Sequence, residues 1–183
     1  MESYRSGNKG VEGLHIILFI ASLFLAYKWG DWRNWQKYYS TILYFGFCDL
    51  VHNCVYCNMP LWVHNCTLGI RLPHTFISLL WVLIIYPTTV LTYIYHFPKT
   101  LKNQVIYIGL WVVGYALMEL MLCLTKGIEY HNNWSIWASI LFNCGMFTIL
   151  WVHYKKPVIA WVLTISLLIV FITVYPIPLE IIK

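Results

Sequence analysis

Asp49, His52 and Asn53 are the residues whose types and spacing most clearly suggest chemistry. They lie near the end of an apolar and aromatic stretch, residues 38–56. In a helix, positions i, i+3, i+4 and i+7 share one face, so these three side chains and Tyr56 are expected to point the same way. A carboxylate within an apolar span is costly unless it faces protein groups or trapped water. Other segments must therefore meet this face.

Glu119 is the second carboxylate deep within an apolar stretch, where it shares a helical face with Tyr115. A histidine beside a buried carboxylate can exchange protons near neutral pH. The sequence thus predicts a water-accessible cavity with carboxylate anchors, titratable histidines and orienting hydrogen-bond groups. Its candidate ligand-binding or proton-handling residues are Asp49, His52, Asn53, His74, Tyr115 and Glu119. The alternative is that these polar groups only join helices to one another as packing contacts.

Three cysteines and one histidine come shortly after Asn53 in the sequence. They form the pattern C-x2-C-x6-H-x-C, with the residues Cys54, Cys57, His64 and Cys66. Thiolates and an imidazole could hold zinc, although this second pair of ligands is compressed. Cys66 could instead form a disulfide with Cys54 or Cys57 on an extracellular face, or all three could stay unlinked. A haem held between His52 and His74 is a further alternative. We expect neither a metal nor a cofactor.

The composition says which elements must position these residues. The chain has 183 residues, of which 60% are hydrophobic and only 10% are charged, far fewer charged residues than a soluble domain needs. Several apolar windows approach the ~20 residues that cross a bilayer as a helix. We therefore predict one all-α domain over residues 1–183, a polytopic membrane bundle of about six transmembrane helices. The predicted spans are 11–29, 38–56, 72–97, 104–124, 134–153 and 157–175.

Charges between the spans predict the orientation and exclude one class of partner. The net charge is +5, but no basic run is interleaved with aromatics as a nucleic-acid surface requires. The loops on one side hold most of the basic residues, which the positive-inside tendency places in the cytoplasm. Both termini are then expected outside the cell. These cytoplasmic basic residues are Lys28, Arg33, Lys37, Lys99, Lys102, Lys155 and Lys156.

Two local features carry further predictions. The segment 30–37 mixes tryptophans with charges, which favours a position along the membrane interface. Pro87 interrupts the third span, where it should free a carbonyl and kink the helix. The threonines that follow it, Thr88 and Thr89, can help to satisfy the backbone there.

Several phrases of the sequence occur together in one group of proteins. They are DWRNWQKYY from Asp31, LPHTFISLL from Leu72, IYPTTVL from Ile85, YHNNWSIWASILFN from Tyr130 and HYKKP from His153. In this combination the chain resembles an uncharacterised family of small multi-pass membrane proteins of spore-forming Gram-positive bacteria, of the bacillus and clostridium type. The resemblance implies a bacterial plasma membrane and a link to sporulation, and it implies no catalytic residues.

Three hypotheses of function follow from these features. The first is a transporter or sensor that handles a small polar ligand or protons in an outer-facing polar cavity. The second is a membrane-embedded enzyme acting on lipid head groups, with or without zinc or haem, in which the same residues do acid–base work. The third is a structural or assembly protein whose polar face only specifies helix pairing. The expected partner is the lipid bilayer, an oligomer is compatible with the small size, and nucleic acid is not expected.

Overall fold

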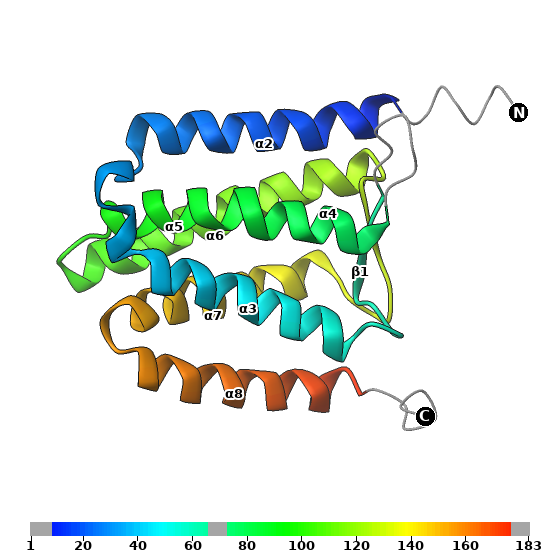
Figure 1. Cartoon of the computed structure of the whole chain (residues 1–183). Helices are drawn as coiled ribbons and strands as arrows, with labels where there is room; N and C mark the ends of the chain where they lie inside the picture. Colours follow the sequence, from blue (N-terminus) through cyan, green and yellow to red (C-terminus); the bar gives the residue numbers. More distant parts are fainter. Residues whose placement is uncertain (1–8, 66–72, 177–183) are drawn as a thin grey trace, which may run out of the picture.

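The computed structural model describes residues 9–65 and 73–176, which form a bundle of seven α-helices with one small β-ribbon. A π-helical turn, Trp81–Ile85, continues α4 into α5, and a 3-10 helix, η1 (Trp32–Lys37), joins α2 to α3. The helices lie side by side, and α2 begins at the same end of the bundle at which α8 ends (Figure 1). Their bounds are α2 Lys9–Trp29, α3 Tyr39–Val55, α4 His74–Leu80, α5 Tyr86–Tyr95, α6 Leu101–Leu124, α7 Ile136–Lys155 and α8 Pro157–Val174.

Four helical segments are long and apolar enough to cross a bilayer, namely His74–Tyr95, Leu101–Leu124, Ile136–Lys155 and Pro157–Val174. The predicted helical bundle with apolar helices of membrane-spanning length is confirmed at this level. The full count of six spans is not reached by the same measure. The described side chains of α2, which runs from Lys9 to Trp29, form the apolar stretch Leu14–Trp29, and α3 has 17 residues. A helix of that length is about 25 Å long, against ~30 Å for the hydrocarbon core.

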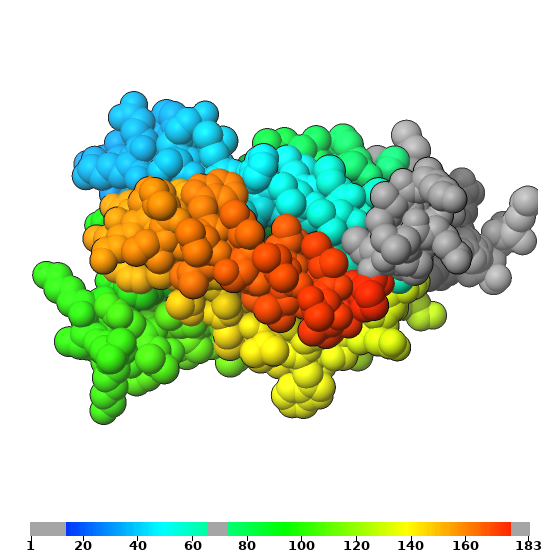
Figure 2. All heavy atoms as spheres, turned by 90° about the horizontal axis from the view of Figure 1, so that it is seen from below, coloured from blue at the N-terminus to red at the C-terminus, as the bar shows by residue number. Residues whose placement is uncertain are grey.

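Apolar side chains cover the outside of the bundle. Val158 on α8 is 76% exposed and Leu141 on α7 is 75% exposed. Figure 2 shows one such face, with α8 running across it between α3 and α7. Exposed apolar surface of this extent is unfavourable in water, whereas acyl chains solvate it without penalty.

One of the buried clusters of the core lies near the turn between α5 and α6. Tyr93 and Phe147 are completely buried there, and the Tyr93 hydroxyl donates a 2.9 Å hydrogen bond to the Phe147 carbonyl. Tyr107 stacks on Tyr93 at 5.5 Å between ring centroids. This cluster joins α5, α6 and α7 into a rigid frame, with the basic connections at the same end of the bundle (Figure 1).

The opposite end is closed by a ribbon that the sequence reading did not predict. Strand β1 (Trp62–His64) pairs antiparallel with β2 (Ile128–Tyr130), so that Trp62 lies opposite Tyr130. The ribbon ties the connection after α3 to the connection after α6. Asn132 and Asn133 follow it with positive φ angles of 52° and 63°, a conformation that asparagine tolerates better than most residues.

Thr88, which follows Pro87, bonds to the backbone of the preceding turn, although not to the carbonyl of Leu83, four residues before the proline. The Thr88 hydroxyl donates to the carbonyls of both Ile84 and Ile85, at 2.8 and 2.9 Å. The π-helical turn directly precedes this point, as is common where a helix is interrupted at depth in a membrane. The segment predicted to lie along the interface is the short helix η1 at the basic end.

Candidate functional site

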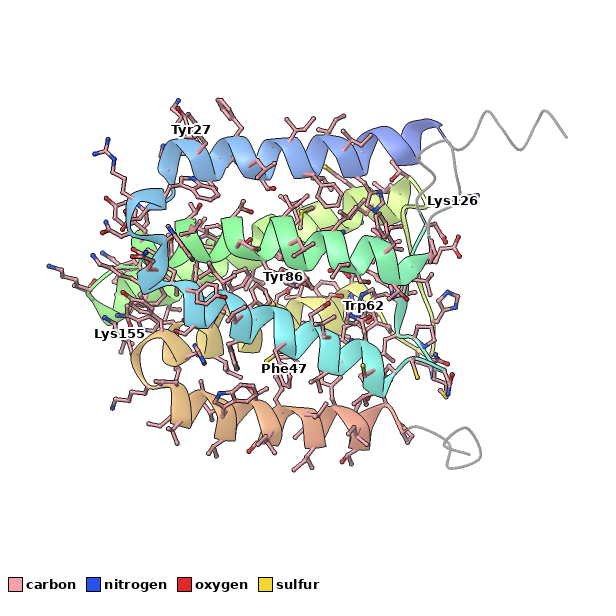
Figure 3. The ribbon with its side chains drawn as sticks, viewed as in Figure 1. Tyr27, Phe47, Trp62, Tyr86, Lys126 and Lys155 are labelled. Atoms are coloured by element: carbon pink, nitrogen blue, oxygen red, sulfur yellow. The ribbon has the colours of Figure 1, made fainter. Side chains whose placement is uncertain are left out.

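The candidate site is a cavity of about 390 Å³ inside the bundle. Its walls come mainly from α3, α6, α7 and α8, with Trp62 at its ribbon end. In Figure 3, Phe47 and Tyr86, which also line it, mark the α3 and α5 sides of this space. Most of the lining is aliphatic or aromatic, so the predicted polar cavity is instead an apolar cavity with a few polar groups.

Asp49 lines the cavity from α3 and is held by neutral donors. The Tyr86 hydroxyl donates to its Oδ1 at 2.8 Å, and the Asn53 amide donates to its Oδ2 at 2.9 Å. Tyr86 begins α5, so this bond joins two helices that are distant in sequence. No lysine or arginine belongs to the described lining of the cavity, so no fixed cation there neutralises this carboxylate.

Glu119 lines the same cavity from α6. Its Oε1 accepts from the Tyr130 hydroxyl at 2.8 Å and from the Ser139 hydroxyl at 2.5 Å. Ser139 accepts in turn from the Trp134 indole N–H at 2.8 Å, which fixes the direction in which its own hydroxyl donates. Both of these bonds fall on Oε1, so Oε2 has no hydrogen-bond partner in the described part of the chain.

His52 lies one turn beyond Asp49 on the same face of α3 and also lines the cavity. Its imidazole stacks on Trp62 at 4.5 Å, with only 9° between the ring planes. Both ring nitrogens are buried and have no hydrogen-bond partner among the described residues. Buried polar atoms are nearly always paired with protein, water or ligand. His52 is therefore suited to meet whatever fills the cavity.

The other three predicted site residues occupy different positions. Asn53 supports Asp49, as described above, and does not itself line the cavity. Tyr115 lines it, and its hydroxyl shares a 2.6 Å hydrogen bond with Thr89 on α5. His74 lies at the ribbon, where its Nδ1 accepts from the His64 backbone N–H at 3.0 Å. The functional roles of all six residues remain predictions.

His64 connects this site to the ribbon. Its ring stacks with that of His74 at 5.5 Å, and it contributes to the cavity lining from β1. Burial, followed by the positive charges that His74 and His15 can carry nearby, holds the pKa of His64 well below its ordinary value of 6.5. His64 is therefore a neutral imidazole at physiological pH.

The structure tests only part of the predicted zinc or disulfide pattern. Cys54 and Cys57 are exposed free thiols, and Cys66 lies outside the described residues. Within residues 9–65 and 73–176, no three histidine, cysteine or acidic side chains are grouped so that they could hold a metal ion. The two histidines considered for haem have different neighbours, Trp62 for His52 and His64 for His74.

The partners of the two carboxylates are the functional residues that sequence reasoning missed. Tyr86, Tyr130 and Ser139 each donate directly to Asp49 or Glu119 from another element of the fold. Tyr86 stands beside the conspicuous Pro87, which marks an irregular helix but gives no indication of a partner. Ser139 and Tyr130 carry no spacing signal toward Glu119.

Comparisons with known proteins do not assign this site. No family model, no curated protein and no solved structure matches the chain. Its function is therefore argued from the cavity and from the residues that line it.

Proposed function

We propose that this is a multi-pass membrane protein that binds a small amphipathic ligand in its central cavity and acts as a transporter or a sensor. One observation carries the proposal: Asp49 and Glu119, carboxylates from two different helices, line a single cavity whose walls are otherwise mainly apolar. The volume, about 390 Å³, is within the ~300–1,000 Å³ typical of small-molecule pockets.

The polar groups at the cavity support ligand binding over simple packing. Contacts that only join helices would use the hydrogen-bonding atoms of each group fully, since unpaired polar atoms are costly in an apolar interior. Asp49 meets this condition through Tyr86 and Asn53. Both nitrogens of His52 do not meet it with any described residue. These atoms are available to a ligand or to bound water.

The cellular setting of the proposal follows from the sequence. The resemblance to multi-pass proteins of spore-forming Gram-positive bacteria supports a plasma-membrane location. The positive-inside tendency favours the basic end in the cytoplasm, with the ribbon outside. In that orientation the end of the cavity that Trp62 lines is nearest the outer face, and carboxylates that bind a ligand in the cavity could also exchange protons with it.

A cavity-filling substitution tests the proposal. Met146 lines the cavity from α7, whereas Leu141 on the same helix is exposed on its outer side. Saturable binding of the neutral fluorescent probe N-phenyl-1-naphthylamine is measured in phosphatidylcholine nanodiscs, with empty nanodiscs as background. We expect binding to wild type and to Leu141→Trp, and its loss in Met146→Trp. Probe binding that is not saturable, or that Met146→Trp leaves unchanged, would show that the cavity is not a ligand site.

A further inference from the structure

The charge of the cavity lining limits which head group a ligand can carry, an argument that rests on the proposed function. The lining contains two carboxylates and, among the described residues, neither lysine nor arginine. An anionic head such as a phosphate, sulfate or carboxylate would enter an apolar space beside two acidic groups with no cation to balance it. Like charges in a low-dielectric interior repel strongly, so an anionic ligand is disfavoured.

Aromatic rings form much of the same wall. A cation is attracted to the electron-rich face of an aromatic ring, and this attraction grows when water is excluded. Rings from α3, α5, α6, α7, α8 and the ribbon end thus offer a second source of attraction for positive charge. The tyrosines and tryptophans of the lining are Tyr44, Trp62, Trp81, Tyr86, Tyr115, Trp134 and Trp161.

Unpaired acceptor atoms lie beside these rings. Glu119 Oε2 lacks a described hydrogen-bond partner, and stacking on Trp62 fixes the plane of the His52 ring. A neutral imidazole has one acceptor nitrogen, and a carboxylate oxygen accepts more than one hydrogen bond. An ammonium group donates up to three hydrogen bonds and accepts none, so its chemistry complements these atoms.

We infer that the ligand is a cationic amphiphile, whose ammonium head lies beside a carboxylate of the lining, Asp49 or Glu119, and whose alkyl chain lies against the apolar walls of α7 and α8. The position of the alkyl chain is inferred from the apolar lining residues of these two helices, which are Phe142, Met146, Ile165, Leu167 and Leu168. No lysine or arginine of the described lining competes for these carboxylates, so the positive charge of the ligand balances one of the two negative charges.

Three amphiphiles with one chain length and different heads test this inference: decylammonium, decanol and decanoate. Each is titrated against bound N-phenyl-1-naphthylamine in phosphatidylcholine nanodiscs at neutral pH. We expect decylammonium to displace the probe at roughly tenfold lower concentration than decanol, with decanoate the weakest. Equal displacement by decylammonium and decanol in the wild-type protein would overturn the inference and leave the proposed cavity site intact.

Variants that remove one negative charge test whether the preference for decylammonium depends on Asp49 and Glu119. Asp49→Asn and Glu119→Gln should each reduce the preference for decylammonium over decanol, measured as the ratio of the two displacing concentrations within each variant, so that any general change in binding cancels. Glu129→Gln is the matched control, because Glu129 is an exposed acidic residue of β2 that does not line the cavity. A preference that survives in both cavity variants would also overturn the inference. An absence of saturable probe binding to wild type would instead reject the proposed function itself.

Discussion

The hydrogen bond from Tyr86 to Asp49 allows a quantitative test of how the site is held. Tyr86→Phe removes one hydroxyl and leaves Asp49 Oδ1 without its 2.8 Å donor. Hydrogen bonds between membrane helices contribute about 0.6 kcal/mol on average and about 1.7 kcal/mol at most. The acceptor here is a carboxylate within an apolar bundle, so we expect a loss near the upper end, about 1.5 kcal/mol in the free energy of unfolding.

The matched control is Tyr107→Phe. The Tyr107 hydroxyl donates to a neutral acceptor, the Tyr93 carbonyl, over a longer distance of 3.2 Å. Its removal should cost about 0.6 kcal/mol, the average value. Both variants are compared by reversible unfolding in mixed micelles of a mild and a denaturing detergent. If Tyr86→Phe costs no more than Tyr107→Phe, the carboxylate does not depend on Tyr86 and this description of the site is wrong.

A double-mutant cycle separates this bond from general packing. Asp49→Asn keeps the size of the side chain but changes its charge and donor pattern. If Tyr86 and Asp49 interact directly, the costs of the two single substitutions will not add, and a coupling energy of about 1 kcal/mol should remain. Additive costs would show that the Tyr86 hydroxyl contributes to stability independently of the Asp49 carboxylate, since Tyr86→Phe keeps the ring that stacks on Phe45 at 4.0 Å.

Two further predictions concern packing and pH. A Cβ added at Gly46 on α3 would come within 2.8 Å of Val82 Cγ1, whereas one at Gly109 on α6 would meet nothing within 4 Å. Gly46→Ala should therefore destabilise the bundle by roughly 1–3 kcal/mol while Gly109→Ala is neutral or stabilising, as the same unfolding assay would report. Because the pKa of His64 in the folded protein is held below 6.5, the unfolded chain binds its proton first on acidification. Stability should therefore fall below about pH 6.5, by up to about 1.4 kcal/mol per pH unit for this group, and His64→Gln should flatten that slope.

The helices were predictable because each one is encoded by its own hydropathy. The third span was expected at 72–97 and is found at His74–Tyr95, and the sixth was expected at 157–175 and is found at Pro157–Val174. The ribbon was not predictable. Its strands have three residues each and lie far apart in the sequence, and they pair only because the bundle brings the two connections together.

Site residues that share one helix could be predicted from the sequence, whereas contacts between helices could not. Helical period alone placed Asp49 and His52 on one face, and both line the cavity. The partner of Asp49 could not be found in this way. Tyr86 reaches it only because α5 takes a particular rotation beside α3, which depends on packing between helices and not on spacing within one of them.

The core of the bundle combines well-packed clusters with an unfilled cavity. At the basic end, buried rings such as Tyr93 and Phe147 fill the space between α5, α6 and α7. Beside this cluster the helices leave a cavity that extends toward the ribbon, and unfilled space costs packing energy. A bundle can tolerate that cost when the rest of its core is well packed and its loops are tied together, as β1 and β2 tie them. Carboxylates placed at such a cavity add a further cost that packing alone does not explain. A cationic ligand would reduce both costs, by filling the volume and by balancing one of the two negative charges.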